Sequence, residues 1–187
     1  MGDDQAVTLR KDPSIAQAVS ECVFMGDIGR GHRNITPVGE YKFWTDPEAA
    51  KIVFETGLKT KMVGWDISVT YAVLGPEGVA ELRAIGTSLA HFCIDIQKTL
   101  QQFALTRTGL GSLDLPDPIA MEIALDPSVA ADTQQLFVAI ETQSDLSRGQ
   151  SVGDQLQVTG NIPNAEVVSE ASHEKYKQIL VDAVRRP

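Results

Sequence analysis

Helix and strand patterns alternate along the first third of the chain, and this alternation restricts the fold more than any other feature of the sequence. Residues 12–19 begin with an Asp-Pro pair and predict a short helix, and the apolar residues 22–25 predict a strand. A second Asp-Pro pair predicts a helix over 46–57, and a buried strand is predicted over 61–67. This alternation indicates an α/β layer structure.

Asp-Pro pairs occur four times, and each predicts a helix start. An Asp at the N-cap accepts a hydrogen bond from the first turn, and the Pro after it lacks only an N–H that would have no partner there. We find no repeat or linker, so residues 1–187 are predicted to form one domain. Other predicted elements are helices from Asp117-Pro118 and Asp126-Pro127, helices within 79–103 with a break at 86–88, strands at 136–142 and 155–158, and a helix over 176–184.

The charge balance restricts the partners. The chain has 16 Lys and Arg against 25 Asp and Glu, a net charge of −9. A negative surface without a basic stripe repels polyanions, so we expect neither nucleic acid nor an anionic membrane as a partner, but a small ligand. Cys22 and Cys93 lie in apolar stretches, which favours reduced thiols and a cytoplasmic protein. No signal-peptide pattern and no membrane-length apolar run is present.

The polar segment 29–47 is the strongest candidate for a ligand site. It follows a predicted strand and precedes a helix start, and ligands of open α/β sheets bind outside the carboxyl ends of strands. Asn34 and Glu40 could hydrogen-bond vicinal hydroxyls of a sugar. Each also has an ordinary interpretation, because Asn34 could cap a turn and Glu40 could be a solvated charge.

Several motifs in fixed order resemble the inosine-uridine preferring nucleoside hydrolases. The matching segments cover nearly the whole chain, and the ordered set is more specific than any one of them. They are Met25-Gly26, Asn34-Ile35-Thr36-Pro37-Val38 with Glu40, Asp46-Pro47-Glu48-Ala49-Ala50, Met62-Val63-Gly64-Trp65-Asp66, Asp117-Pro118-Ile119-Ala120, Asp126-Pro127, and Arg148-Gly149-Gln150-Ser151-Val152 with Asp154.

The resemblance implies an open, mostly parallel, Rossmann-like α/β sheet with flanking helices, and hydrolysis of the N-glycosidic bond of ribonucleosides with a bound Ca²⁺. By position, Met25 would pack on the ribose, Asn34 and Glu40 would bind its hydroxyls, and Asp117 would be a Ca²⁺ ligand. A hard cation prefers such oxygen ligands. Asp117 could equally be a simple helix cap, like the Asp of the other three pairs.

Departures from the family pattern are equally informative. The acidic metal motif of the first family strand, which includes the general base, has no counterpart here, so residues 1–187 would form a single partial domain without its N-terminal strands. Lys42 replaces an Asn of the signature and adds a cation near the expected Ca²⁺. Asp27 and Arg33 replace glycines, and Pro116 replaces a His that some members use as a proton donor.

Two functions are therefore weighed. The chain is either the ribose-binding part of a nucleoside hydrolase or a non-catalytic truncated paralogue or fragment that folds without a complete Ca²⁺ site. In both cases we expect the isolated chain to be weakly active or inactive, because one aspartate cannot supply six to eight oxygens. A homo-oligomer is compatible with either.

Overall fold

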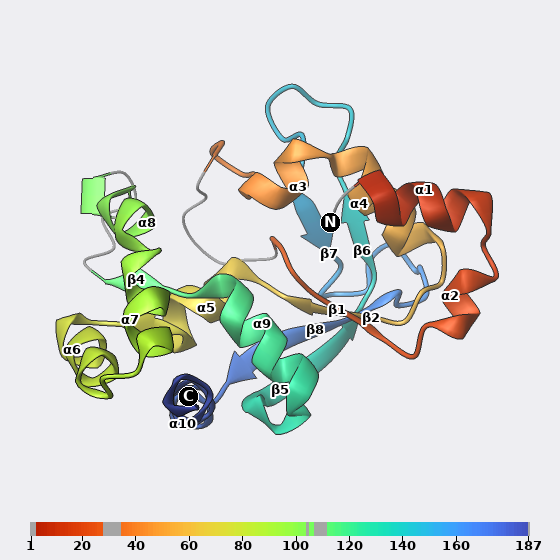
Figure 1. Ribbon diagram of the computed structural model, residues 1–187. Coiled ribbons are helices and arrows are strands. Elements are labelled where there is room, and N and C mark those ends of the chain that lie inside the picture. Colours follow the sequence, from red (N-terminus) through yellow and green to blue (C-terminus); the bar gives the residue numbers. More distant parts are fainter. Residues whose placement is uncertain (1–2, 28–34, 104, 107–111, 187) are drawn as a thin grey trace.

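A four-stranded sheet lies at the centre of the computed structural model, which describes residues 3–27, 35–103, 105–106 and 112–186 (Figure 1). The strand order is β1 (Cys22–Met25), β2 (Thr60–Val63), β8 (Ala165–Ala171) and β5 (Ala130–Leu136). The pairs β1–β2 and β2–β8 are parallel, whereas β5 pairs with β8 in the antiparallel direction. The predicted open, mostly parallel α/β sheet is confirmed.

Helices cover both faces of this sheet. Figure 1 shows α1 and α4 on one side and α9 and α10 on the other. Two small antiparallel sheets pair β3 (Val73–Leu74) with β4 (Leu113–Asp114), and β6 (Val138–Ile140) with β7 (Ser151–Gly153). The helices are α1 (Asp3–Lys11), α2 (Ile15–Ala18), α3 (Tyr41–Thr45), α4 (Pro47–Glu55), α5 (Trp65–Tyr71), α6 (Pro76–Ala84), α7 (Ser88–Asp95), α8 (Lys98–Phe103), α9 (Pro116–Leu125), α10 (His173–Arg185) and a 3₁₀ turn at Pro127–Val129.

The two faces of the sheet bury separate apolar cores. On the face of α3 and α4, Phe24, Phe43 and Phe54 pack edge to face or tilted, with 5.5 Å between the ring centroids of Phe24 and Phe54. On the opposite face, Met25 and Ile119 belong to a larger cluster that joins α5, α9 and α10. Burial of apolar side chains on both faces is typical of parallel sheets.

Several helix limits agree with their local signals. Asp46 caps α4, since its Oδ1 accepts a hydrogen bond of 2.9 Å from the Ala49 amide. Gly57 follows α4 with φ = +73°, a conformation that suits a glycine at a helix end. Thr87 caps α7 through the Ala90 amide at 3.1 Å. The break predicted at 86–88 and the closing helix are confirmed.

Other predicted limits are wrong. The strand predicted over 61–67 ends at Val63, and Gly64 is already the N-cap of α5. Asp117 lies in the first turn of α9 and does not cap it, because that helix begins at Pro116. Asp126 caps only a 3₁₀ turn, through the Ser128 amide. Residues 155–158 form turns instead of a strand.

Two strands have too few apolar residues in sequence to be predicted as buried strands. The exposed edge strand β5 consists mainly of polar residues. The internal strand β8 includes Glu166, whose carboxylate lies 3.6 Å from the Lys61 ammonium of β2. Because the two charges pair inside the sheet, β8 does not read as a continuous apolar run.

Candidate functional site

The carboxyl ends of β1 and β2 lie side by side. Gly26 directly follows β1, and its amide donates a hydrogen bond of 3.1 Å to the carbonyl of Val63, the last residue of β2. A side chain at Gly26 would collide with the Phe43 ring, so α3 approaches this strand end closely. Met25 is buried at the end of β1. These contacts place Met25 where a ligand of an open α/β sheet is expected.

Asp27 and Ser151 join two distant segments at this strand end. Asp27 is fully buried, and its carbonyl accepts a hydrogen bond from the Ser151 hydroxyl at the start of β7. The Asp27 side chain therefore replaces a family glycine without projecting into solvent. The contact fixes the small β6–β7 sheet to the end of β1.

Glu40 is the N-cap of α3. It is buried, and its Oε2 accepts a hydrogen bond of 3.0 Å from the Lys42 amide. The approach to this cap is a turn in which the Thr36 hydroxyl accepts a 2.7 Å hydrogen bond from the Gly39 amide. The interpretation of Glu40 as a solvated charge is wrong, whereas its ribose-binding role stays a prediction. Asn34 lies outside the described residues, as does Arg33.

Lys42 and Asp117 connect α3 to the first turn of α9. The Lys42 ammonium forms an ion pair with Asp117 Oδ1, although 75 residues separate them in sequence. The Asp117 side chain is 69% exposed and that of Lys42 is 31% exposed. Asp117, the metal ligand that the resemblance implies, therefore lies at the same end of the sheet as Met25 and Glu40. Its carboxylate is paired with the Lys42 ammonium.

The acidic residues do not form a metal centre by themselves. Within the described parts of the chain, no group of three or more His, Cys, Asp or Glu side chains could hold an ion. A Ca²⁺ ion takes six to eight oxygen ligands, and a neighbouring ammonium repels it. The residues present therefore do not fit a Ca²⁺ ion without additional ligands.

Arg148 fastens the polar loop before β7 to α4. Its two terminal nitrogens each lie 2.6 Å from a carboxylate oxygen of Glu48, and Nη1 also donates to the Thr142 carbonyl at 2.9 Å. The next residue, Gly149, has φ = +82° and lies against the Trp44 backbone. The Arg-Gly pair of the family motif therefore holds this loop against α3 and α4.

The Arg148–Glu48 pair should change the pKa of the Glu48 carboxyl, which can be measured. The hydrogen bond from Arg148 lowers the pKa of the Glu48 carboxyl below its ordinary value. We expect Arg148→Ala to return the pKa of Glu48 to its ordinary range in a side-chain NMR titration, with Lys51→Ala as a control on the same helix. An unchanged Glu48 pKa in Arg148→Ala would show that the pair does not persist in solution.

The two tryptophans differ in environment. Trp65 is buried, and its Nε1 donates a hydrogen bond of 2.8 Å to Asp114 Oδ2, so it is part of the core. Trp44 is partly exposed on α3, beside Gly149. Of the two, only Trp44 presents ring surface to solvent near the candidate site.

Glu122 and Tyr176 carry buried polar groups, and of the two residues only Glu122 is not expected to be buried from the sequence. Glu122 lies on α9 and is 6% exposed, and Tyr176 on α10 is fully buried. Within the described residues, neither Glu122 Oε2 nor the Tyr176 hydroxyl has a hydrogen-bond partner. Burial raises the pKa of Glu122 to about 8, and burial together with the Glu122 and Asp114 carboxyls raises the pKa of Tyr176. The apolar spacing of α9 gave no sign of a charge on its inner face.

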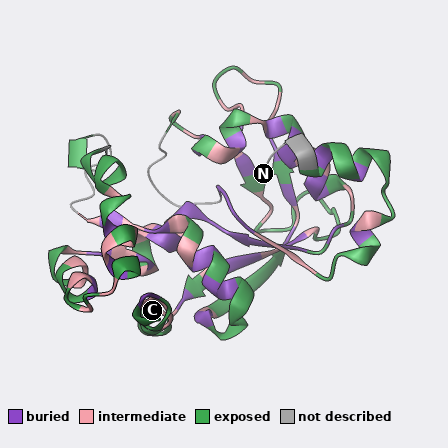
Figure 2. Ribbon diagram, in the orientation of Figure 1, coloured by how far each residue is buried: buried purple, intermediate pink, exposed green. Residues whose placement is uncertain are grey.

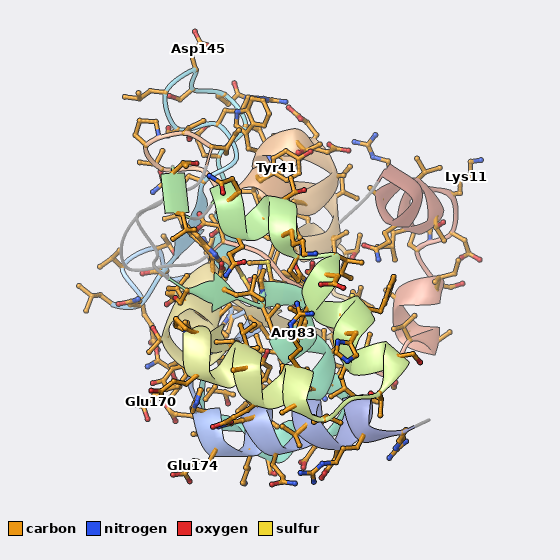
Figure 3. All side chains as sticks on the ribbon, turned by 60° about the vertical axis from the view of Figure 1, so that its left-hand side comes forward. Lys11, Tyr41, Arg83, Asp145, Glu170 and Glu174 are labelled. Atoms are coloured by element: carbon orange, nitrogen blue, oxygen red, sulfur yellow. The ribbon has the colours of Figure 1, made fainter. Side chains whose placement is uncertain are left out.

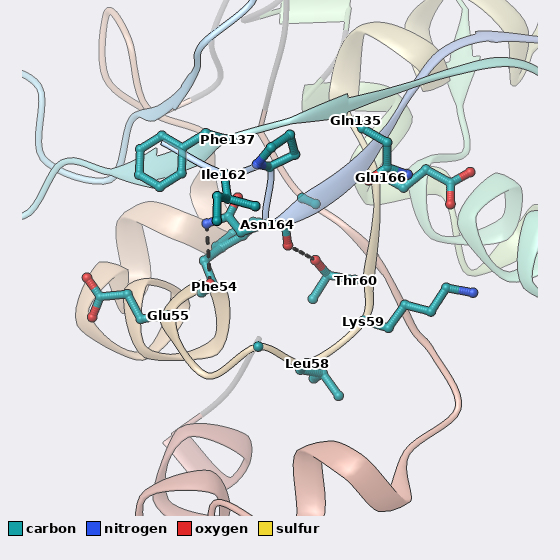
Figure 4. Close-up of a pocket in the computed structure, with 13 residues that line it drawn as sticks. Phe54, Glu55, Leu58, Lys59, Thr60, Gln135, Phe137, Ile162, Asn164 and Glu166 are labelled. Atoms are coloured by element: carbon teal, nitrogen blue, oxygen red, sulfur yellow. Dashed lines mark hydrogen bonds between the residues drawn. The ribbon is translucent and has the colours of Figure 1, made fainter. Parts of the chain in front are cut away.

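A cavity of about 520 Å³ lies at the end of the sheet opposite the candidate site, which is at the carboxyl ends of β1 and β2 (Figure 4). It is lined by the start of β2, the start of β8 and the end of β5. Its polar groups already bind one another: Thr60 Oγ1 donates to the Asn164 carbonyl at 3.0 Å, and Asn164 Nδ2 donates to the Phe54 carbonyl at 3.3 Å. This cavity is therefore separate from the candidate site.

Fold and site together define an open α/β protein with its polar groups gathered at the carboxyl ends of parallel strands. Figure 3 shows α10, with Glu174 labelled, on the side of the molecule away from α3, where Tyr41 is labelled. Residues 5–178 match the family described as inosine-uridine preferring nucleoside hydrolase. The chain belongs to this family, as the resemblance implies.

Curated relatives and solved structures agree with this assignment. The chain is 29% identical over 181 residues to the pyrimidine-specific ribonucleoside hydrolases RihA of Escherichia coli O8 (strain IAI1) and Shigella sonnei (strain Ss046), with 96% of this chain and 57% of each relative covered. It therefore spans little more than half their length. No helix in the described parts of the chain is long and apolar enough to cross a membrane.

Two solved structures show the same fold. A plant nucleoside hydrolase, PpNRh1, superposes with a TM-score of 0.88 at 20% identity, covering 97% of this chain and 58% of that one. A purine-preferring ribonucleoside hydrolase from Gardnerella vaginalis gives a TM-score of 0.83 at 23% identity, covering 96% of this chain and 56% of that one.

Proposed function

We propose that this chain is the ribose-binding part of a nucleoside hydrolase, which hydrolyses the N-glycosidic bond of ribonucleosides to ribose and free base. One observation carries the proposal: Met25, Glu40 and Asp117 gather at the carboxyl ends of β1 and β2 in a chain that belongs to this family. Residues 1–187 would form a single partial domain. The free, half-buried thiols of Cys22 and Cys93 agree with a cytoplasmic location.

The described side chains suit the binding of a sugar. The Glu40 carboxylate, set at the N-terminus of α3, would accept hydrogen bonds from vicinal ribose hydroxyls, and the Met25 thioether would pack on the sugar. A fixed carboxylate also favours the positive charge that develops on the sugar ring as the bond to the base breaks. The general base would come from residues other than 1–187.

A metal would complete this chemistry. The family is generally metal-dependent, and the resemblance proposes Ca²⁺, which would orient sugar hydroxyls and a water molecule when bound. Asp117 is the ligand that this chain would give, and the remaining oxygens would come from other residues. In this structure the Asp117 carboxylate is paired with the Lys42 ammonium instead.

Methionine methyl groups provide the direct test of ribose binding. The four methionines include Met25 at the site, fully buried Met62 and exposed Met121 on α9, so the last two serve as internal controls. We expect inosine, uridine or ribose to shift the Met25 methyl resonance in ¹³C-methyl NMR while Met62 and Met121 stay in place. A shift of Met121 without Met25, or no shift at any methyl group, would overturn the proposal.

The second candidate function is a non-catalytic paralogue, which the Lys42–Asp117 ion pair favours. A reducing-sugar assay separates the two. The isolated chain should release little or no ribose from inosine or uridine. The chain can also be fused to the segment of RihA that lies outside the matched region. If this chain is the ribose-binding part of a hydrolase, the fusion should release ribose, and Glu40→Gln should reduce that release. A paralogue should release none in either form.

Lys42 should also oppose cation binding at Asp117. Replacement by the Asn of the family pattern removes a positive charge beside the carboxylate. We therefore expect Lys42→Asn to raise the affinity of Ca²⁺ for this position about tenfold, measured through the Asp117 amide resonance. Lys51→Asn, which removes an exposed ammonium near Glu55 on α4, is the matched control. Equal affinities in Lys42→Asn and the wild-type chain would contradict this role.

A further inference from the structure

Glu122 of α9 and Tyr176 of α10 bring polar groups into the apolar core between these two helices. Along α9, buried residues recur between exposed ones (Figure 2), and Glu122 shares the buried face with Ile119 and Ile123. Tyr176 belongs to the same apolar cluster as the two isoleucines. A carboxyl group and a phenol hydroxyl are therefore removed from solvent in surroundings that are mainly hydrocarbon.

Each of these two groups has a polar atom that the protein leaves unbonded. Among the residues that the structure describes, neither Glu122 Oε2 nor the Tyr176 hydroxyl has a hydrogen-bond partner, although both atoms are shielded from solvent. Such atoms lower stability, and nearly all buried polar atoms of native proteins bond either to protein or to ordered water. Two of them at one helix interface point to a partner outside the polypeptide.

The two groups lie near each other without bonding directly. Burial, and after it the charges of the Glu122 and Asp114 carboxyls, raises the pKa of the Tyr176 hydroxyl, yet no hydrogen bond joins Tyr176 to Glu122. Asp114 Oδ2 accepts its hydrogen bond of 2.8 Å from Trp65 Nε1. Polar atoms that face each other beyond direct hydrogen-bonding distance are commonly joined by a water molecule.

Other polar side chains at the start of α10 already have partners elsewhere. The Lys175 ammonium donates to the Ser128 carbonyl at 3.0 Å, and His173 Nδ1 lies 2.8 Å from the Tyr71 carbonyl. In the described parts of the chain, no cation pairs with Glu122. A partner that serves both Glu122 and Tyr176 therefore has to come from solvent.

We infer that one buried water molecule binds between α9 and α10, where it bridges Glu122 Oε2 and the Tyr176 hydroxyl. Water both donates and accepts hydrogen bonds, so it suits a carboxyl group and a phenol together. Buried waters typically make about three hydrogen bonds, and the Asp114 carboxylate is the third polar group of this region. A metal cation suits the position less well, because burial keeps the Glu122 carboxyl uncharged up to about pH 8.

The water site would connect several elements through polar contacts. Together with the hydrogen bond between Trp65 and Asp114, it links α5, β4, α9 and α10. The bridge thus holds the helix whose first turn carries Asp117. The water site does not depend on the proposed function, because neither Glu122 nor Tyr176 belongs to the candidate site, so a failed Met25 methyl test would leave it unaffected.

A double-mutant cycle tests the bridge. Glu122→Met and Tyr176→Phe each remove one polar group with little change in volume, and each leaves the other group without its shared partner. In urea unfolding at about pH 6, we expect each single change to lower the folding equilibrium constant about tenfold. The double variant should lose about tenfold as well, instead of the product of the two effects, because no unpaired atom remains. Tyr71→Phe, at a partly buried tyrosine against the same core, should combine additively with Glu122→Met.

Oxygen-17 relaxation dispersion of the solvent detects the water itself, since it counts long-lived buried waters in the folded protein. The wild-type chain should hold one such water more than the double variant Glu122→Met/Tyr176→Phe. Glu122→Gln, which keeps the side-chain length and the ability to form hydrogen bonds, should retain this water. The single variant Tyr176→Phe provides the same comparison if the double variant does not fold.

Three results would overturn the inference. Additive effects of Glu122→Met and Tyr176→Phe would mean that the two groups share no partner. Equal water counts in the wild-type chain and the double variant would mean that the two side chains bond to each other directly. Stability that rises with NaCl or KCl but not with choline chloride, and only while Glu122 is present, would assign the position to a cation.

Discussion

Raising the pH from about 4.5 to about 8 should lower the free energy of unfolding, and Glu122→Gln should remove that dependence. The Glu122 carboxyl is buried on the inner face of α9 near Tyr176, and burial raises its pKa to about 8. In the unfolded chain the group ionises near its ordinary value of 4.5. Between these values the folded protein retains a proton that the unfolded chain has lost.

The sign follows from this difference in bound protons. Below about pH 4.5 both states are protonated, and the full stability is present. As the pH rises toward about 8, stability falls by up to about 1.4 kcal/mol for each pH unit, because folding must then take up a proton. Above about 8 both states are ionised and the loss levels off, at no more than about 5 kcal/mol.

Urea unfolding across this pH range measures the effect. Glu122→Gln should give a nearly flat profile, whereas Glu77→Gln, an exposed change on α6, should keep the wild-type slope. Carboxyl groups with lowered pKa values, such as Glu48 and Asp126, act below this range. If Glu122→Gln shows the wild-type slope, the carboxyl is not buried in solution.

Gly149→Ala should destabilise the fold by about 2–4 kcal/mol, a size typical of backbone strain combined with overpacking. Two effects add. The φ of +82° is unfavourable for a side chain, and the new Cβ would lie 2.6 Å from Trp44 Cα and 2.8 Å from Trp44 N. Since both atoms belong to the backbone of α3, a rotamer change cannot relieve the collision, and α3 or the loop must move.

Two glycines separate the contributions. Gly57→Ala tests a positive φ of +73° with no atom within 4 Å of the new Cβ, and should cost about 1 kcal/mol. Gly75→Ala, at a negative φ and equally open, should change stability little. Chemical unfolding gives the three values, and Trp44 fluorescence reports the shift of α3. Equal costs at Gly149 and Gly57 would mean that the loop does not rest on Trp44.

Sequence reasoning succeeded where the signal was local. Asp46 and Thr87 predict helix starts because their side chains accept hydrogen bonds from amides three residues later in the chain. Gly57 predicts a helix end because few residues other than glycine adopt its positive φ. These interactions involve neighbours only. The α/β order could therefore be predicted without knowledge of the tertiary fold.

Interactions between residues far apart in the sequence could not be predicted in the same way. Strand β8 carries Glu166, a charge that becomes acceptable only beside Lys61 of β2. Likewise, Lys42 departs from the family pattern, but its partner Asp117 lies on another helix. Among the residues that the structure describes, no cation pairs with Glu122, and the spacing of α9 does not mark its position. Side-chain pairs that form across the fold cannot be read from spacing.

The position of β8 has a consequence for synthesis of the chain. This strand lies between β2 and β5, although it follows both of them in the sequence. Until residues 165–171 leave the ribosome, β2 has only β1 as a partner and β5 has none in the described sheet. The central sheet is therefore completed only by contacts between strands that lie far apart in the sequence, and contacts of this kind form slowly during folding.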